Sequence, residues 1–206
     1  MVTERVGTDT GWDPAVGADE SAQRLRAAVL ALRQPQAAKR APAPRSSVYG
    51  RAAAAVPDDV HAPSTTVQLA ARFRNAETTA LMAGTSLCLV VLPTPGPPPP
   101  ELARSLALLA SGSAVVVVLG PSVPRDVPAD RSRPLLVPLR ADDSLAGEWA
   151  LVACGPAKRV AFLARAEAED SWSWLLTRDT IAVQRAATAL LERVPFLRLR
   201  VPPLVS

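Results

Sequence analysis

The pattern of hydrophobic and polar positions divides the 206-residue chain into a polar, proline-rich N-terminal part and a more hydrophobic remainder. Residues 1–63 contain few aromatic or β-branched side chains, which is typical of a segment that cannot bury a core. Within them, residues 21–33 place apolar side chains at i, i+3, i+4 and i+7, a spacing that predicts a short amphipathic helix. We therefore expect a disordered tail and linker over 1–63 and a folded domain over 64–206.

The short amphipathic helix predicted near 21–33 has two interpretations. Helices of this length are marginal in isolation, so it could pack loosely on the domain or form only transiently. Alternatively, its apolar stripe docks on a partner protein through Leu25, Val29 and Leu32. A helix that lies on a lipid surface is disfavoured, because the stripe lacks Trp and Phe.

The remainder of the chain alternates between segments of helical and of strand periodicity. Helical spacing extends from Thr65 or Thr66, either of which could cap the helix, to about Ala83, and Gly84 suits the position after its end. A continuous apolar run then predicts a buried strand over 86–92. The further elements that we expect are a helix over 101–112, strands over 114–119, 135–139, 148–154, 159–164 and 171–177, and a helix over 180–193 that Asp179 caps.

The order of these elements predicts the fold class. Helices and strands alternate first, as in an α/β unit, and the later strands follow one another, as in an antiparallel meander. We expect an α/β fold of mixed α+β character, with a single mixed sheet, helices packed on it and a largely disordered N-terminal tail before it.

Charge is spread evenly along the chain and does not indicate nucleic-acid binding. The net charge is +4, and residues 1–65 hold eight Lys and Arg against seven Asp and Glu, while the rest holds fifteen against twelve. A nucleic-acid interface needs a clustered basic excess, with roughly six to ten phosphate contacts. We expect no direct nucleic-acid binding by this chain.

Residue types that carry out catalysis or bind metals do not occur in a usable pattern. Cys88 and Cys154 lie within apolar runs, where cysteine behaves as a small buried hydrophobe. The sequence has no CxxC motif, and its single histidine, His61, stands in a polar stretch flanked by prolines. We expect no enzymatic activity, no catalytic residues and no metal site, and the sequence identifies no cofactor.

The first twenty residues are polar and do not resemble a secretory signal peptide. The longest apolar runs are shorter than the roughly twenty residues that span a bilayer. We therefore expect a cytoplasmic protein that does not interact with membranes.

The segment from Val67 to Val194 carries several short sequence blocks in a defined order. The most specific is Asp142 to Pro156, which begins Asp-x-x-Leu-x-x-Glu-Trp. The other blocks are Leu69 to Leu92 with Glu77, Ser105 to Gly120, Ala161 to Glu167, and Trp174 to Arg193 with Asp179 and Val183. With these blocks the segment resembles the DICT domain, a sensory family named after its association with diguanylate cyclases and two-component systems.

The resemblance implies a sensory module that controls an output domain, which in actinobacterial members is often a MerR-type DNA-binding domain. Residues 1–65 show no helix-turn-helix pattern, and Pro93–Pro100 replaces the family's aromatic-Gln segment. We therefore expect a non-enzymatic sensory or regulatory module in bacterial signal transduction that acts on a separate transcription or signalling protein. The alternative is an adaptor without a ligand that docks through residues 21–33.

Scarce aromatic side chains provide the main candidates for a ligand site. Three tryptophans could line a pocket for a flat small molecule, with an arginine facing an anionic group of the ligand. Two tryptophans at i and i+2 in an amphipathic strand also suit a packed core. The candidate ligand-binding residues are Trp149, Trp172, Trp174, Arg165, Arg178 and Glu148.

The acidic residues Asp142, Asp143 and Glu148 could also be interpreted as a cation site. A metal ion needs several oxygen ligands that converge on one point. Two of these carboxylates flank a turn and the third leads into a strand, so we favour a structural role in the turn and at the strand end.

Overall fold

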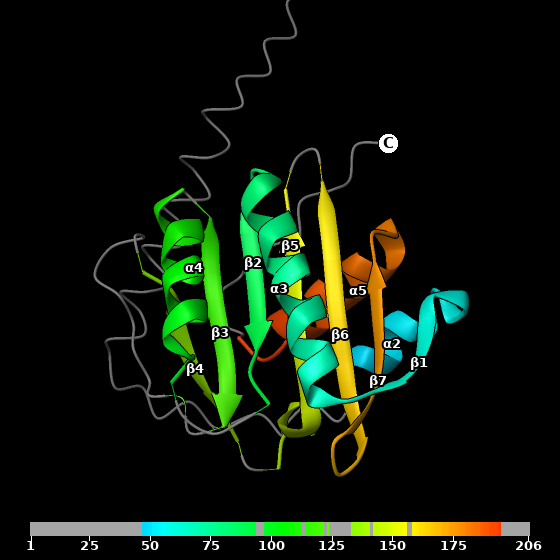
Figure 1. Cartoon of the computed structure of the whole chain (residues 1–206). Helices are drawn as coiled ribbons and strands as arrows, with labels where there is room; N and C mark the ends of the chain where they lie inside the picture. The colour runs from blue at the N-terminus through cyan, green and yellow to red at the C-terminus, as the bar shows by residue number, and fades with distance from the viewer. Residues whose placement is uncertain are drawn as a thin grey trace, which may run out of the picture.

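The computed structural model describes residues 47–93, 97–112, 114–121, 123, 133–140, 142–155 and 158–194. They form one seven-stranded sheet in the order β1-β7-β6-β5-β2-β3-β4 (Figure 1). The strands are β1 Val60–Ser64, β2 Leu87–Val91, β3 Val115–Pro121, β4 Leu135–Leu139, β5 Glu148–Cys154, β6 Arg159–Ala168 and β7 Ser171–Thr177. The helices are α2 Val48–Ala53, α3 Thr66–Met82, α4 Pro100–Ser111 and α5 Thr180–Leu191, with short 3-10 turns η1 Pro57–Asp59 and η2 Ser144–Gly147. A single mixed sheet with helices packed on it is confirmed.

The sheet has a parallel part and an antiparallel part, as the order of elements predicts. β2 pairs with β3 and β3 with β4, both in parallel. β5, β6 and β7 form an antiparallel meander, and β1 adds to its edge. The two parts join where β5 runs antiparallel to β2.

Local signals set the ends of the helices that begin the α/β unit. Thr65 accepts a hydrogen bond from the backbone N–H of Gln68, while the Gln68 side chain accepts one from the backbone N–H of Thr65. This reciprocal pair satisfies donors that the first turn of α3 leaves without helical partners. Gly84, with φ of 60°, follows the helix in the left-handed conformation that glycine adopts without strain.

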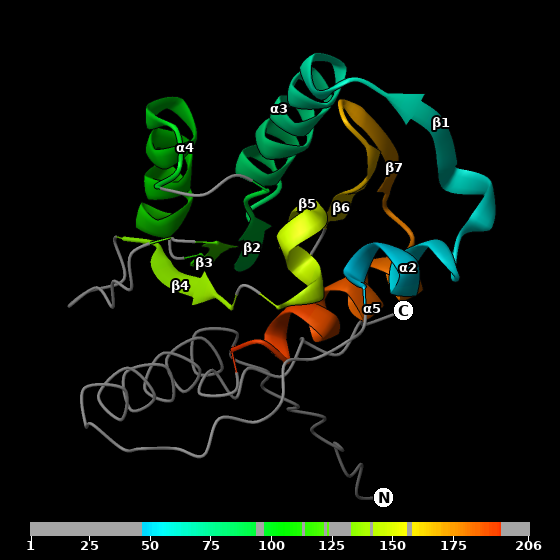
Figure 2. The same ribbon diagram turned by 90° about the horizontal axis from the view of Figure 1, so that it is seen from below.

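Helices cover both faces of the sheet and produce two core layers (Figure 2). α3 and α4 pack on one face, which we call the α3 face, around Leu69, Phe73, Leu106 and Phe162. α2 and α5 pack on the opposite face, the α2 face, with Leu89, Leu163 and Leu190 among its buried residues.

The folded region begins earlier than the sequence predicts. Residues 1–63 are expected to be a disordered tail and linker, but α2 starts at Val48 and β1 at Val60. Val48 and Ala52 are fully buried and Tyr49 nearly so. The prediction of a disordered linker is therefore wrong from Ser47 onward. The reason is that Val48 and Tyr49, although they stand in a proline-rich stretch, are buried in the core of the α2 face.

The predicted helix near 21–33, with its candidate docking residues Leu25, Val29 and Leu32, lies outside the described residues. The helix and its docking role stay predictions.

Candidate functional site

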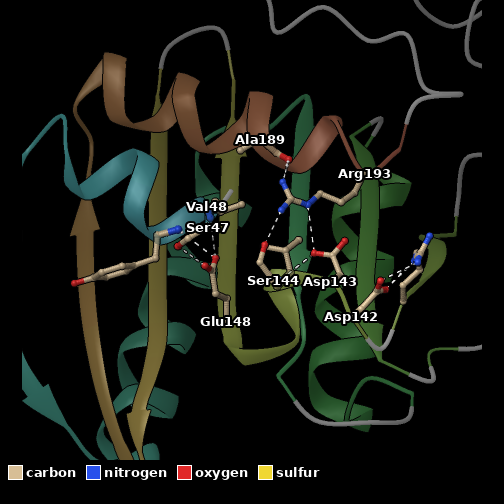
Figure 3. Close-up of polar contacts among 11 residues, drawn as sticks. Ser47, Val48, Asp142, Asp143, Ser144, Glu148, Ala189 and Arg193 are labelled. Atoms are coloured by element: carbon tan, nitrogen blue, oxygen red, sulfur yellow. Dashed lines mark hydrogen bonds and ion pairs between the residues drawn. The ribbon is translucent and has the colours of Figure 1, made fainter. Parts of the chain in front are cut away.

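Glu148, at the start of β5, holds the N-terminus of α2. Its side chain is 2% exposed and accepts hydrogen bonds from the Ser47 hydroxyl and from the backbone N–H groups of Val48 and Tyr49, the latter two at 3.1 and 3.2 Å (Figure 3). Those N–H groups begin a helix and have no partner inside it. We call Glu148, Ser47 and these two N–H groups the α2 latch.

Burial raises the pKa of the Glu148 carboxyl group, and it is the largest influence on that group. Hydrogen bonds from Ser47, Tyr49 and Val48, together with the charge of Arg193, act in the opposite direction. The latch therefore places a buried acid where hydrogen-bond donors offset part of the cost of its charge.

α2 is too short to be stable without the latch and the sheet. It has six residues, and isolated helices of such length do not persist in water. Ser47 serves twice, because its hydroxyl donates to Glu148 and accepts from the backbone N–H of Gly50 at 2.9 Å. Arg165 of β6 adds a cation–π contact, with its guanidinium carbon 5.1 Å from the Tyr49 ring centre.

A second polar contact fastens the end of α5 to the turn before β5. The Arg193 side chain donates to the backbone carbonyl of Ala189 at 2.6 Å and to the Ser144 hydroxyl at 3.1 Å (Figure 3). Its Nε lies 3.5 Å from Oδ1 of Asp143, and both side chains are at most 5% exposed. Asp143 Oδ1 also accepts from the backbone N–H of Leu145, which caps η2.

Asp142 lies outside this buried network. It forms a two-point ion pair with Arg140, with both N–O distances 2.8 Å, and both side chains are exposed. The hydrogen bond from Arg140 lowers the pKa of Asp142. Exposed pairs of this kind contribute little to stability.

The acidic side chains of the block thus point to separate partners and do not form a cation site. Asp142 binds Arg140, Asp143 binds Arg193 and Leu145, and Glu148 binds the start of α2. Across the described ranges, no group of three or more His, Cys, Asp or Glu side chains could hold a metal ion.

The three candidate tryptophans share the α3 face, as strand alternation predicts. Trp149 stacks on Phe73 at a centroid distance of 5.0 Å and meets the edge of Trp172 at 6.4 Å. Trp174 lies beside the His61 ring at 4.0 Å, and the Arg72 guanidinium is 4.1 Å from its ring centre.

The polar edges of these tryptophans are not open to a ligand. Trp172 donates its Nε1–H to the Thr66 hydroxyl at 3.0 Å. The Nε1 atoms of Trp149 and Trp174 are buried and, among the described residues, have no hydrogen-bond partner. Phe73 covers Trp149, while His61 and Arg72 cover Trp174.

The six candidate ligand-binding residues do not all lie on one face of the sheet, and ligand binding by the three tryptophans stays a prediction. Glu148 and Arg165 are paired across β5 and β6 with their side chains towards α2, while the tryptophans lie towards α3. Adjacent residues of a strand point to opposite faces, so Glu148 and Trp149 are separated by the sheet itself. Arg178 is exposed in the turn between β7 and α5.

A groove of about 320 Å³ lies between α2 and the outer side of α5. Its lining comprises Arg51 of α2 and Ile181, Gln184, Arg185 and Thr188 of α5. Arg51 Nη1 forms an ion pair with Glu192 Oε1 at 2.8 Å beside it. The sequence does not indicate this groove, because Arg51 lies in a segment that its composition predicts to be a linker.

Both cysteines are buried, as predicted, and neither suits nucleophilic chemistry. Burial raises the pKa of Cys88 to about 12 and that of Cys154 to about 11. A thiol with so high a pKa is protonated at neutral pH and unreactive. Cys88 belongs to the α3-face core and Cys154 to the α2-face core.

The residues that sequence reasoning missed are Ser47, Tyr49, Arg51 and Arg193. One signal was available: Val48-Tyr49 places an apolar and an aromatic side chain inside an otherwise polar stretch, and Tyr49 is the only tyrosine of the chain. The position of Arg193 near the end of a predicted helix does not indicate that its partner is Asp143, fifty residues earlier.

Comparison with known proteins leaves the family open. No family model matches the chain, and no curated protein matches it. Among solved structures, a polyphosphate kinase from Porphyromonas gingivalis aligns with a TM-score of 0.45 and 10% identity, over 65% of this chain and 23% of that chain. The aligned part is less than a quarter of the kinase, and a likeness this weak supports no conclusion about function.

Within the described ranges, no helix combines the length and the apolar character needed to cross a bilayer.

Proposed function

We propose that the chain is a non-enzymatic, cytoplasmic sensory or regulatory module of bacterial signal transduction that acts on a separate transcription or signalling protein. The observation that carries this proposal is the α2 latch. The polar side chains of the most specific sequence block bind the protein's own chain, and Glu148 holds the helix that directly follows residues 1–46. The resemblance to DICT sensory domains supports the same function.

The mechanism is a shift between a latched and a released α2. α2 has only six residues; one carboxylate holds its start, and Val48, Tyr49 and Ala52 are buried where it packs, mainly on α5. Such an element opens locally at a cost below that of global unfolding. A ligand or partner that binds better to the latched form shifts the population towards it, and the tail that precedes α2 carries the change.

The adaptor alternative uses the same tail in a different way. In it, Leu25, Val29 and Leu32 of the tail bind the partner directly, and the domain is only an anchor. The two proposals differ in one expectation. Only the sensory proposal requires that release of α2 from Glu148 changes the activity of the partner protein.

The test is complementation of a deletion strain with full-length variants. We expect the deletion to change a defined set of transcripts, wild type to restore them, and Glu148→Ala to fail although the protein accumulates as a folded monomer or oligomer. Asp142→Asn is the matched control, because it changes the same block without touching α2, and it should complement. Equal complementation by Glu148→Ala and wild type would favour the adaptor, and an unchanged set of transcripts in the deletion strain would contradict the regulatory role.

A further inference from the structure

The groove between α2 and α5 has the composition of a small binding site. Ile181, Gln184, Arg185 and Thr188 follow one another at i, i+3, i+4 and i+7, so they form a single outward stripe along α5. Arg51 closes the groove from α2. Its volume of about 320 Å³ is at the small end of the range for ligand pockets.

The charge of the groove is positive. Arg51 and Arg185 line it, and no acidic side chain does. Glu192 neutralises Arg51 in part, by an ion pair in which both side chains are more than a third exposed. Among the described residues, Arg185 has no acidic partner within ion-pair distance, so its guanidinium is available to a ligand.

The side chains indicate which ligand chemistry fits. Guanidinium groups present planar, forked N–H donors that match the oxygens of a phosphate group. Thr188 and Gln184 add neutral donors on the same stripe, and Ile181, 56% exposed, adds an apolar surface at the N-terminal end of α5. The small volume favours one phosphate with a compact organic part.

We propose that this groove binds a small organic phosphate, with Arg185 and Arg51 on the phosphate and Ile181 against the organic part. Because Arg51 belongs to α2, the bound anion joins α2 to α5 and stabilises the latched form. The inference deepens the proposed sensory function and rests on it for its regulatory consequence, but the binding itself follows from the groove.

The experiment is an NMR titration of the uniformly ¹⁵N-labelled full chain with phenyl phosphate. We expect saturable shifts of the backbone amides of Arg51, Arg185 and Thr188, weaker binding of inorganic phosphate and no shift with phenol. Arg185→Gln should weaken phenyl phosphate binding on the order of tenfold or more, since it removes a charged pair of donors. Arg104→Gln makes the same change in charge at an exposed position of α4, and it should leave the affinity for phenyl phosphate unchanged.

A reverse variant sharpens the test. Glu192→Gln frees Arg51 from its ion pair and should tighten phenyl phosphate binding, while Glu101→Gln on α4 makes the same change in net charge and should not. Absence of saturable shifts in wild type, or equal weakening by Arg185→Gln and Arg104→Gln, would overturn the proposal. Because no partner or transcript is involved, failure here is distinct from failure of the complementation test.

Discussion

The two faces of the sheet are stabilised in different ways. On the α3 face, a long helix with its own capping box packs by aromatic and aliphatic contacts around Phe73 and Trp149. On the α2 face, a six-residue helix and the end of α5 are fastened by the buried polar side chains of Glu148 and Arg193. Both faces have apolar cores, but the distant polar contacts that Asp170 and Trp172 make with Thr66 at the start of α3 are exposed, whereas those of Glu148 and Arg193 on the α2 face are buried.

This difference shows where a signal can act. Apolar packing over a 17-residue helix responds little to single polar contacts, so the α3 face is suited to be the rigid support. A short helix whose start is held by one buried carboxylate can open locally, and a ligand or partner can stabilise either its closed or its open form. The proposed switch therefore belongs to the α2 face.

The largest effect is expected where a buried ion pair is broken. Arg193→Met leaves the Asp143 carboxylate buried without its cation, and this should lower the free energy of unfolding by about 3–5 kcal/mol. Urea denaturation followed by circular dichroism measures it. Arg140→Met removes the cation of an exposed pair and should have no measurable effect, so equal losses in the two variants would contradict the contrast.

A loss of about 3–4 kcal/mol is expected on the opposite face, from Phe73→Ala. Phe73 is 3% exposed and packs between Trp149 and Phe162, so its removal opens a cavity beside Trp149. Tryptophan emission should shift to longer wavelength. Hydrogen exchange of the α2 amides should be as slow as in wild type when each protein is measured the same number of degrees below its own melting temperature. Faster exchange of α2 in Phe73→Ala would mean that the stability of the α2 face depends on packing on the α3 face.

A smaller effect is expected from pH. Burial raises the folded-state pKa of Glu148, so the folded protein binds more protons than the unfolded chain between the ordinary carboxyl pKa of about 4.3 and the raised value. Stability from this group is therefore greatest below that window and falls as pH rises through it. Glu148→Gln should flatten this part of the stability–pH curve, and a curve unchanged by the substitution would contradict the assignment.

The smallest effect is expected from Asp142→Asn. Asp142 is exposed, and the hydrogen bond from Arg140 lowers its pKa. Any contribution of this pair to the free energy of unfolding would therefore be present above the ordinary carboxyl pKa and would be lost as pH falls. Solvent screens such a pair, and we expect no change in melting temperature at neutral pH. A clear drop would place Asp142 in the buried network of Asp143 and Arg193.

The sequence predicts the α3 face well because its signals are local. The Thr65 cap, Gly84 after α3 and the alternation of Trp172 and Trp174 are all as expected. Each depends on residues within a few positions of one another, and short-range periodicity reports such features directly.

The α2 face was predicted less well because its determinants are distant in sequence. Ser47 and Glu148 are 101 positions apart, and Asp143 and Arg193 are 50 apart. A proline-rich composition argued for a linker at Val48 and Tyr49, whereas the Glu148 carboxylate of β5 and the burial of these two side chains make a helix there favourable. The candidate ligand-binding residues are divided for a related reason, since Glu148 and Trp149 are neighbours in sequence but lie on opposite faces.

The most direct test of the latch is hydrogen exchange of α2 in the full chain, with wild type and Glu148→Ala compared by mass spectrometry. The account predicts that Glu148→Ala exposes the amides of residues 48–53 to fast exchange while α3 and the β2–β5 strands keep their protection. If α2 stays as protected as in wild type, or if the whole domain loses protection together, then Glu148 is not a separable latch and the proposed switch does not exist.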